Sequence, residues 1–187
     1  MSGKYVVITG PSGAGKTTIV EWFLGAEPAC ARLVTTTTRA PRPGECRGVD
    51  YHFTSVEDFK SRIQAEEFLE HEANFDEYYG SSRIDLAKLL ALHPIVFGVL
   101  DPKGAATVKR KMPESSVVML VSSFEELGGR LKRRFGADSP KVQRRLKEAE
   151  REMADTSFCE FVMQSHDGEL DRMVAILRGN LARYLGK

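Results

Sequence analysis

The 187-residue sequence predicts an α/β fold in which a parallel sheet is flanked by helices. Apolar runs rich in β-branched residues alternate with helical segments along most of the chain, which is the pattern of strands buried on both faces. A glycine-rich loop at 10–17 follows the first apolar run and opens the first helix. Ligands of such folds bind at the carboxyl ends of the strands, so the loop predicts a site at that edge of the sheet.

The alternation assigns the elements in turn. Strands are expected at 5–9, 51–53, 95–100, 117–121 and 161–163, an extended segment at 32–38, and helices at 17–24, 85–92, 103–111, 124–135, 140–153 and 170–185. A further helix is expected to begin at Ser55, because Asp58 follows it at the spacing of a capping box. The prolines and glycine of 39–45 exclude a helix there. Residues 66–82, which are rich in acids and tyrosines, are expected to be irregular.

Two stretches stand outside the alternation, at 35–85 and 126–147. We expect one domain over 1–187, whose core comprises 1–34, 86–125 and 148–187. The two stretches are then candidates for small subdomains hinged on that core, a common arrangement for segments that close over a ligand.

The composition argues against several functional classes. The net charge is +1, so no overall basic field favours nucleic acid. No apolar run approaches the roughly 20 residues of a membrane span. The three cysteines lack metal-binding or CxxC spacing, which favours reduced thiols and a cytoplasmic protein. A monomer and a homodimer both remain open.

The loop at 10–17 fits the phosphate-binding pattern G-x-x-x-x-G-K-[ST]. Its glycines let the backbone approach a polyphosphate, and its N–H groups point at the anion together with the start of the helix. Lys16 would add a cation near the β- and γ-phosphates, and the Thr17 hydroxyl is placed to ligate Mg²⁺. The residues expected to bind a nucleoside triphosphate are Gly10, Ser12, Gly13, Ala14, Gly15, Lys16, Thr17 and Thr18.

A second anion site is predicted in the segment 35–82. Arg39 and Arg42 lie in a stretch stiffened by prolines, so both guanidinium groups can project toward one phosphate. Tyr51 and Tyr79 can each donate a hydroxyl to the same anion.

Four further residues are suited to a purine base. Glu70 and Asp101 are carboxylates at the ends of apolar segments, and a carboxylate accepts well from the neighbouring N–H donors of guanine. Thr35 and Ser81 supply small hydroxyls that suit the guanine O6. Each residue alone can be explained as a packing residue or a surface charge. The prediction of a purine site depends on their combination.

Taken together, these motifs resemble the guanylate kinase family. The matching stretches are 10–18, 36–45, 48–53, 68–70, 79–81, 100–101 with Gly104, and 130–131. The resemblance implies a P-loop kinase core, a nucleoside-monophosphate-binding subdomain at 35–85 and a helical lid at 126–147. It also implies Mg²⁺-dependent transfer of the γ-phosphate of ATP to GMP or dGMP.

The resemblance also implies roles for single residues. Arg39, Arg42, Tyr51 and Tyr79 would hold the GMP phosphate, Glu70, Ser81 and Asp101 would read guanine, Lys16 would bridge the two substrates, and Arg130, Arg134 and Arg145 would close from the lid. The lid spacing shifts by one residue, so Arg133 can exchange roles with Arg134. Thr35 stands where the family usually has serine, and Val99 and Ser165 replace an acidic residue and an asparagine.

Three other functions compete with this interpretation. A sugar-phosphate kinase on the same scaffold would keep Lys16 and the lid arginines without needing the base-reading set. A catalytically silent protein-binding module would typically lack an intact phosphate loop, which is complete here. A nucleic-acid-binding ATPase would need further motor motifs, and the sequence offers none.

Overall fold

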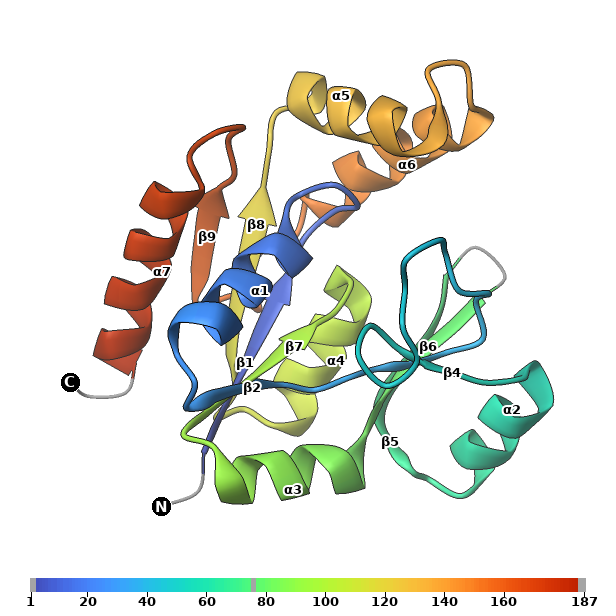
Figure 1. The fold of residues 1–187 in the computed structure, drawn as a ribbon, viewed down its shortest axis with the longest axis vertical. Coiled ribbons are helices and arrows are strands. Elements are labelled where there is room, and N and C mark those ends of the chain that lie inside the picture. The colour runs from blue at the N-terminus through green and yellow to red at the C-terminus, as the bar shows by residue number, and fades with distance from the viewer. Residues whose placement is uncertain (1–2, 75–76, 185–187) are drawn as a thin grey trace.

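The computed structural model describes residues 3–74 and 77–184. Its centre is a five-stranded sheet in the order β2-β7-β1-β8-β9 (Figure 1). Every neighbouring pair in this sheet is parallel, which confirms the predicted fold class. The strands are β1 (Lys4–Thr9), β2 (Cys30–Arg32), β7 (Ile95–Val99), β8 (Ser116–Val121) and β9 (Phe161–Gln164).

Helices cover both faces of this sheet, and the side chains of β1 alternate between the two. Val6 and Ile8 join a core cluster with α1 (Lys16–Ala26) and α7 (Leu170–Tyr184). Tyr5 and Val7 point to the opposite face, toward α3 (Arg83–Leu92) and α4 (Pro102–Lys111). A strand buried on both faces needs apolar residues at every position, which is why its sequence is continuously apolar.

A second, four-stranded sheet has the order β4-β3-β6-β5 and lies beside the core together with α2 (Val56–Gln64) (Figure 1). Its strands are β3 (Thr36–Thr37), β4 (His52–Phe53), β5 (Phe68–Asn74) and β6 (Glu77–Ser82). The extended segment predicted at 32–38 is therefore divided, since β2 belongs to the first sheet and β3 to the second.

The expectation of irregular structure at 66–82 is wrong for 68–74 and 77–82, because β5 and β6 pair there as antiparallel strands, while 75–76 lie outside the described residues. Two features hide the strand pattern. The register shifts between Phe68 and Glu70, so Phe68, Leu69 and Glu70 are all buried without alternating. Several polar side chains of β5 and β6 also line the cavity described below. They therefore do not mark a solvent-facing side of the strands.

The helix boundaries follow local capping. Ser55 Oγ accepts from the Asp58 N–H at 3.1 Å, as predicted, although the Asp58 carboxylate accepts from the Thr54 hydroxyl and does not return to the Ser55 backbone. A complete capping box forms instead at Ser123 and Glu126, where α5 (Phe124–Phe135) begins. The sequence analysis did not identify this second box.

Helices α5 and α6 (Pro140–Glu152) pack against each other beyond the carboxyl end of β8 (Figure 1). The chain turns between them at Gly136, whose φ of +90° suits glycine. None of the helices in the described part of the chain is long and apolar enough to cross a membrane.

Candidate functional site

The phosphate-binding loop connects β1 to α1 and has the backbone that its glycines predict. Gly10 has a φ of +130°, and a β-carbon there would lie 2.1 Å from the Leu120 carbonyl oxygen. Gly15 has a φ of +89° and caps α1, which has no acidic residue in its first turn. The loop therefore leaves the positive end of the helix dipole open toward an anion.

Lys16 folds back over this loop. Its Nζ donates to the carbonyl oxygens of Gly10 at 2.6 Å and Pro11 at 2.9 Å. Burial lowers the pKa of Lys16, while the negative charges of Glu152 and Asp101 act in the opposite direction. The ammonium is thus held beside the loop by weak carbonyl acceptors, which a phosphate oxygen can replace.

A cavity of about 560 Å³ opens beside the loop at the carboxyl ends of the central strands. It is bounded by the loop, the second sheet, α5, α6 and the segment after β9. Seventeen of the residues predicted for the site line it: Gly10, Ser12, Gly13, Gly15, Lys16, Thr17, Thr18, Thr35, Arg39, Arg42, Tyr51, Glu70, Tyr79, Asp101, Arg130, Arg134 and Arg145. The lining omits Ala14 and Ser81, both of which are fully buried.

Arg39 and Arg42 lie on the second sheet's side of the cavity, where Glu45 holds both. The Glu45 carboxylate pairs with Arg39 Nη2 at 2.8 Å and accepts from the Arg42 N–H at 2.8 Å. Arg39 is 7% exposed, and its guanidinium lies 5.2 Å from the centre of the Tyr51 ring. Burial acts to raise the pKa of Glu45, but the hydrogen bonds from the two arginines lower it overall. Glu45 belongs to the same motif as the arginines, and the sequence analysis gave it no role.

The two predicted tyrosines meet edge to face, with ring centroids 6.1 Å apart. The Tyr79 hydroxyl donates to Glu77 Oε2 at 2.9 Å. Burial, together with Glu77, raises the pKa of Tyr79 to about 12. Tyr79 is therefore protonated at neutral pH and remains a hydrogen-bond donor.

Glu70 forms the floor of the cavity on the side of β5. It is 3% exposed, and its Oε1 accepts from Ser81 Oγ at 2.6 Å. Burial raises the pKa of Glu70 to about 7, although the Ser81 hydrogen bond acts to lower it. Asp101 lies nearby as the N-cap of α4, where its Oδ1 accepts from the Gly104 N–H at 2.8 Å. A β-carbon at Gly104 would lie 2.8 Å from Glu70 Oε2, so this glycine makes room for the carboxylate.

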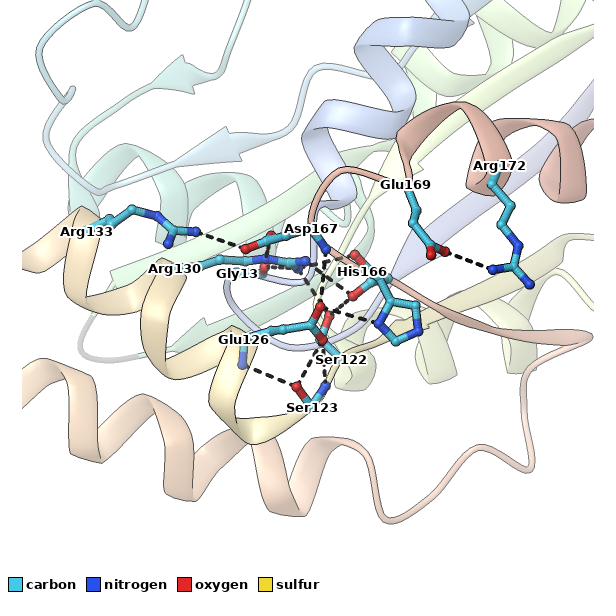
Figure 2. Close-up of polar contacts among 11 residues, drawn as sticks. Gly13, Ser122, Ser123, Glu126, Arg130, Arg133, His166, Asp167, Glu169 and Arg172 are labelled. Carbon is cyan, nitrogen blue, oxygen red and sulfur yellow. Dashed lines mark hydrogen bonds and ion pairs between the residues drawn. The ribbon is translucent and has the colours of Figure 1, made fainter.

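Arg130 reaches the phosphate-binding loop from α5, as Figure 2 shows. Its Nη1 donates to the Gly13 carbonyl oxygen at 2.9 Å, to Ser122 Oγ at 3.1 Å and to Ser165 Oγ at 3.2 Å. Its Nε pairs with Asp167 at 2.8 Å. Arg130 therefore ties α5 to the loop and to the segment after β9, in addition to lining the cavity.

The two arginines that follow on α5 differ in position, since one lies outside the cavity lining and the other belongs to it. Arg133 reaches Asp167 at 3.3 Å and is absent from the cavity lining, whereas Arg134 lines the cavity. Arg134 and Arg145 both lie over the Phe135 ring, at 5.3 and 5.2 Å from its centre. Burial lowers the pKa of Arg145, and the neighbouring charge of Arg42 acts in the same direction.

The cavity also has lining residues that the sequence analysis missed. Glu148 and Glu152 lie one helical turn apart on α6, on the face that carries Arg145. Burial raises the pKa of Glu152 to about 7, while the positive charge of Lys16 lowers it. The segment after β9 contributes Ser165, His166, Asp167 and Gly168. The helical spacing of the two glutamates and the position of this segment at a strand end are the signals that could have identified them.

Comparisons with known proteins agree with this geometry. A family model described as "Guanylate kinase" matches residues 2–184. The chain is 41% identical over 165 residues to a guanylate kinase from Salinibacter ruber, covering 87% of each protein. It is 39% identical over 191 residues to one from Neisseria gonorrhoeae, covering 98% of this chain and 93% of that protein.

A solved structure is similar as well. The crystal structure of guanylate kinase from Anaplasma phagocytophilum superposes with a TM-score of 0.73 at 28% identity, covering 96% of this chain and 86% of that chain. The family model spans nearly the whole sequence, and the relatives exceed 30% identity over most of it. The chain therefore belongs to the guanylate kinase family.

Proposed function

We propose that the protein transfers the γ-phosphate of ATP to GMP or dGMP, giving ADP and GDP or dGDP. The observation that carries this proposal is that one cavity joins the phosphate-binding loop to a second anion site formed by Arg39 and Arg42 and to the buried carboxylate of Glu70. Family membership supports the same activity. A sugar-phosphate acceptor would leave Glu70 buried without a ligand, which is unfavourable.

Phosphoryl transfer requires alignment and charge neutralisation more than covalent chemistry. In the proposed complex the loop N–H groups and Lys16 hold the donor phosphates. Arg39, Arg42, Tyr51 and Tyr79 hold the acceptor phosphate, whose attacking oxygen is already largely deprotonated at neutral pH, so no general base is needed. Arg134 and Arg145 neutralise charge between the two, and Arg130 fixes α5 against the loop.

The base end of the cavity would select guanine. Glu70 and Asp101 would accept from its N–H donors, Thr35 would donate to O6, and Ser81 would hold Glu70 from behind at 2.6 Å. A buried acceptor rejects a base that lacks the matching donors, because the acceptor is then left unpaired. AMP would therefore be a poor acceptor.

Mg²⁺ fits the side of the cavity that would bind ATP. Thr17 is an exposed residue at the start of α1 and lines the cavity next to Lys16. Within residues 3–74 and 77–184 no group of three His, Cys, Asp or Glu side chains is arranged to hold a metal. The ion would therefore be held mainly by the nucleotide phosphates, water and Thr17, as Mg²⁺ commonly is, and it would supply charge neutralisation there.

The domain organisation belongs to the same proposal. Residues 35–85 would form the subdomain that binds GMP and 126–147 the lid, both moving on a core of 1–34, 86–125 and 148–187. Closure of both would exclude water and so limit ATP hydrolysis. We also propose a cytoplasmic enzyme that acts on free nucleotides as a monomer or homodimer, since the net charge of +1 provides no field for nucleic acid.

The decisive experiment measures ADP formation from ATP and Mg²⁺ with GMP, dGMP, AMP, CMP, UMP or no acceptor. We expect product only with GMP or dGMP. ADP formed equally with every acceptor, or with none added, would contradict the proposal. If none of the nucleoside monophosphates supports ADP formation while ATP still binds, a sugar phosphate would be favoured as the acceptor.

A further inference from the structure

Tyr5 carries a buried hydroxyl that the proposed mechanism does not use. The residue is the second of β1 and is 2% exposed. Within the described chain its hydroxyl has no hydrogen-bond partner of good geometry. Leaving such a group unpaired opposes folding, so a buried phenol oxygen calls for an explanation.

The side chain runs along the sheet toward the cavity. Tyr5 pairs with Val96 in the register of β1 and β7, whereas its hydroxyl lies over Gly98, two residues further toward the carboxyl end. A β-carbon at Gly98 would lie 2.2 Å from Tyr5 Oη and 2.7 Å from its Cζ. Gly98 is the one position without a side chain in the apolar strand β7, and it leaves the space that Tyr5 fills.

Glu70 and Ser81, on strands β5 and β6, are the polar side chains that act on the phenol. Burial and the charge of Glu70 raise the pKa of Tyr5 well above its usual range, and a contact with Ser81 acts to lower it. The phenol is therefore protonated throughout the working pH range and has a proton to donate. Ser81 commits its own proton to Glu70 Oε1 at 2.6 Å, which leaves the Ser81 oxygen as the neighbouring acceptor.

We propose that Tyr5 is a positioning residue for guanine recognition: its hydroxyl donates to Ser81 Oγ when GMP binds, and Ser81 in turn holds Glu70 in the orientation that accepts from the base. The inference rests on the proposed role of Glu70. Hydrogen bonds in a chain polarise one another, so a donor behind Ser81 strengthens its bond to the Glu70 carboxylate. A donor that stabilises the ionised carboxylate also offsets the burial that disfavours it.

The test is Tyr5→Phe, which removes one oxygen and leaves the ring in place over Gly98. We expect the KM for GMP to rise about fivefold, the usual value of one hydrogen bond. The KM for ATP and the kcat at saturating GMP are expected to stay near wild type. The pH below which GMP binding weakens is expected to move upward, because Glu70 loses support for its charge.

Tyr184→Phe is the matched control, since it removes a phenol oxygen at the end of α7, outside the cavity lining. It should leave both KM values and the pH profile unchanged. A Tyr5→Phe enzyme whose GMP KM and pH profile match the wild type would overturn the inference. So would equal increases in the KM for GMP and the KM for ATP, because a purely structural role of Tyr5 predicts them.

Glu70→Gln separates this inference from the function on which it rests. If Glu70→Gln leaves GMP use unchanged, the base site itself is wrongly assigned and the inference falls with it. If Glu70→Gln impairs GMP use and Tyr5→Phe does not, only the inference fails. In the Ser81→Ala background, Tyr5→Phe should add little, because Tyr5 acts through Ser81. Fully additive effects would contradict that chain of contacts.

Discussion

The two ends of the cavity are built in different ways. The end that we assign to ATP is a contiguous loop whose backbone N–H groups, glycine conformations and helix start belong to residues 10–18. The end that we assign to GMP is assembled from β5, β6, the segments flanking β3 and β4, and the N-cap of α4, with side chains supplying the recognition groups. A backbone site tolerates changes in neighbouring side chains, whereas a side-chain site depends on every supporting contact.

The largest effect is expected at the lysine side chain of the loop end. Lys16→Ala should lower kcat by about 10³-fold, because it removes a cation from the site of charge development. Lys132→Ala, which removes an exposed lysine of α5, is the control and should behave as wild type. Steady-state ADP formation measures both. Substantial turnover in Lys16→Ala, with circular dichroism showing an intact fold, would contradict the role of the lysine.

The next effect concerns the paired arginines of the other end. Glu45→Gln should raise the KM for GMP by about 10- to 100-fold, because both Arg39 and Arg42 lose the carboxylate that holds them. The KM for ATP should change little. Glu27→Gln, which disrupts the exposed ion pair with Arg178 at 2.9 Å, serves as a matched control. Equal behaviour of the two variants would mean that Glu45 does not position the arginines.

A smaller effect tests the space around Glu70. Gly104→Ala places a β-carbon 2.8 Å from Glu70 Oε2 and should displace the carboxylate, raising the KM for GMP about tenfold. Gly179→Ala also lies in a helix but has no atom within 4 Å of the added carbon. It should keep wild-type kinetics and become slightly more stable. Calorimetric titration of both variants with GMP compares their affinities directly.

A graded effect, small just below neutrality, is a pH dependence of GMP binding. Because burial raises the pKa of Glu70 to about 7, its carboxyl becomes protonated below neutrality and accepts less well from guanine. The KM for GMP should therefore rise as pH falls below 7, approaching about tenfold per unit. Glu70→Gln should lack this limb and retain only the titration of GMP itself. An identical profile in both enzymes would argue against Glu70 as the base-reading group.

The raised pKa of Glu70 also predicts how the free energy of unfolding depends on pH. The sign is opposite to that for an Asp or Glu whose pKa is lowered on folding. Between the unfolded value near 4.5 and the folded value near 7, the folded protein binds more protons than the unfolded chain. The free energy of unfolding should therefore fall as pH rises through this window. Glu152 has a similarly raised pKa and should contribute in the same direction. Urea denaturation of Glu70→Gln at several pH values should show a shallower decline than wild type.

Much of the fold could be predicted because its signals are local. The apolar strands of the core and the periodic helices each occupy contiguous residues, and the loop motif adds its own chemistry. The segment 66–82 could not be predicted in this way. Its strands carry charged and aromatic residues for the cavity, and a register shift after Phe68 removes the alternation that usually marks a strand.

Contacts between distant segments account for the features that sequence reasoning missed. Nothing near Arg130 in the sequence indicates that it binds the Gly13 carbonyl, because the two residues are brought together only by packing α5 over the loop. The position of Ser81 behind Glu70 likewise depends on the pairing of β6 with β5, and that of Tyr5 against Gly98 on the pairing of β1 with β7.

The sequence alone determined the α/β class, the glycine-rich loop and the residue types of both proposed anion sites, because each depends on short-range pattern and backbone chemistry. Tertiary structure decided which of those side chains reach one cavity, which serve as supports behind it, and which carboxyls are buried deeply enough to have a raised pKa. The physical reason is that burial and hydrogen-bond partners are properties of the assembled fold, and neither is contained in any one segment.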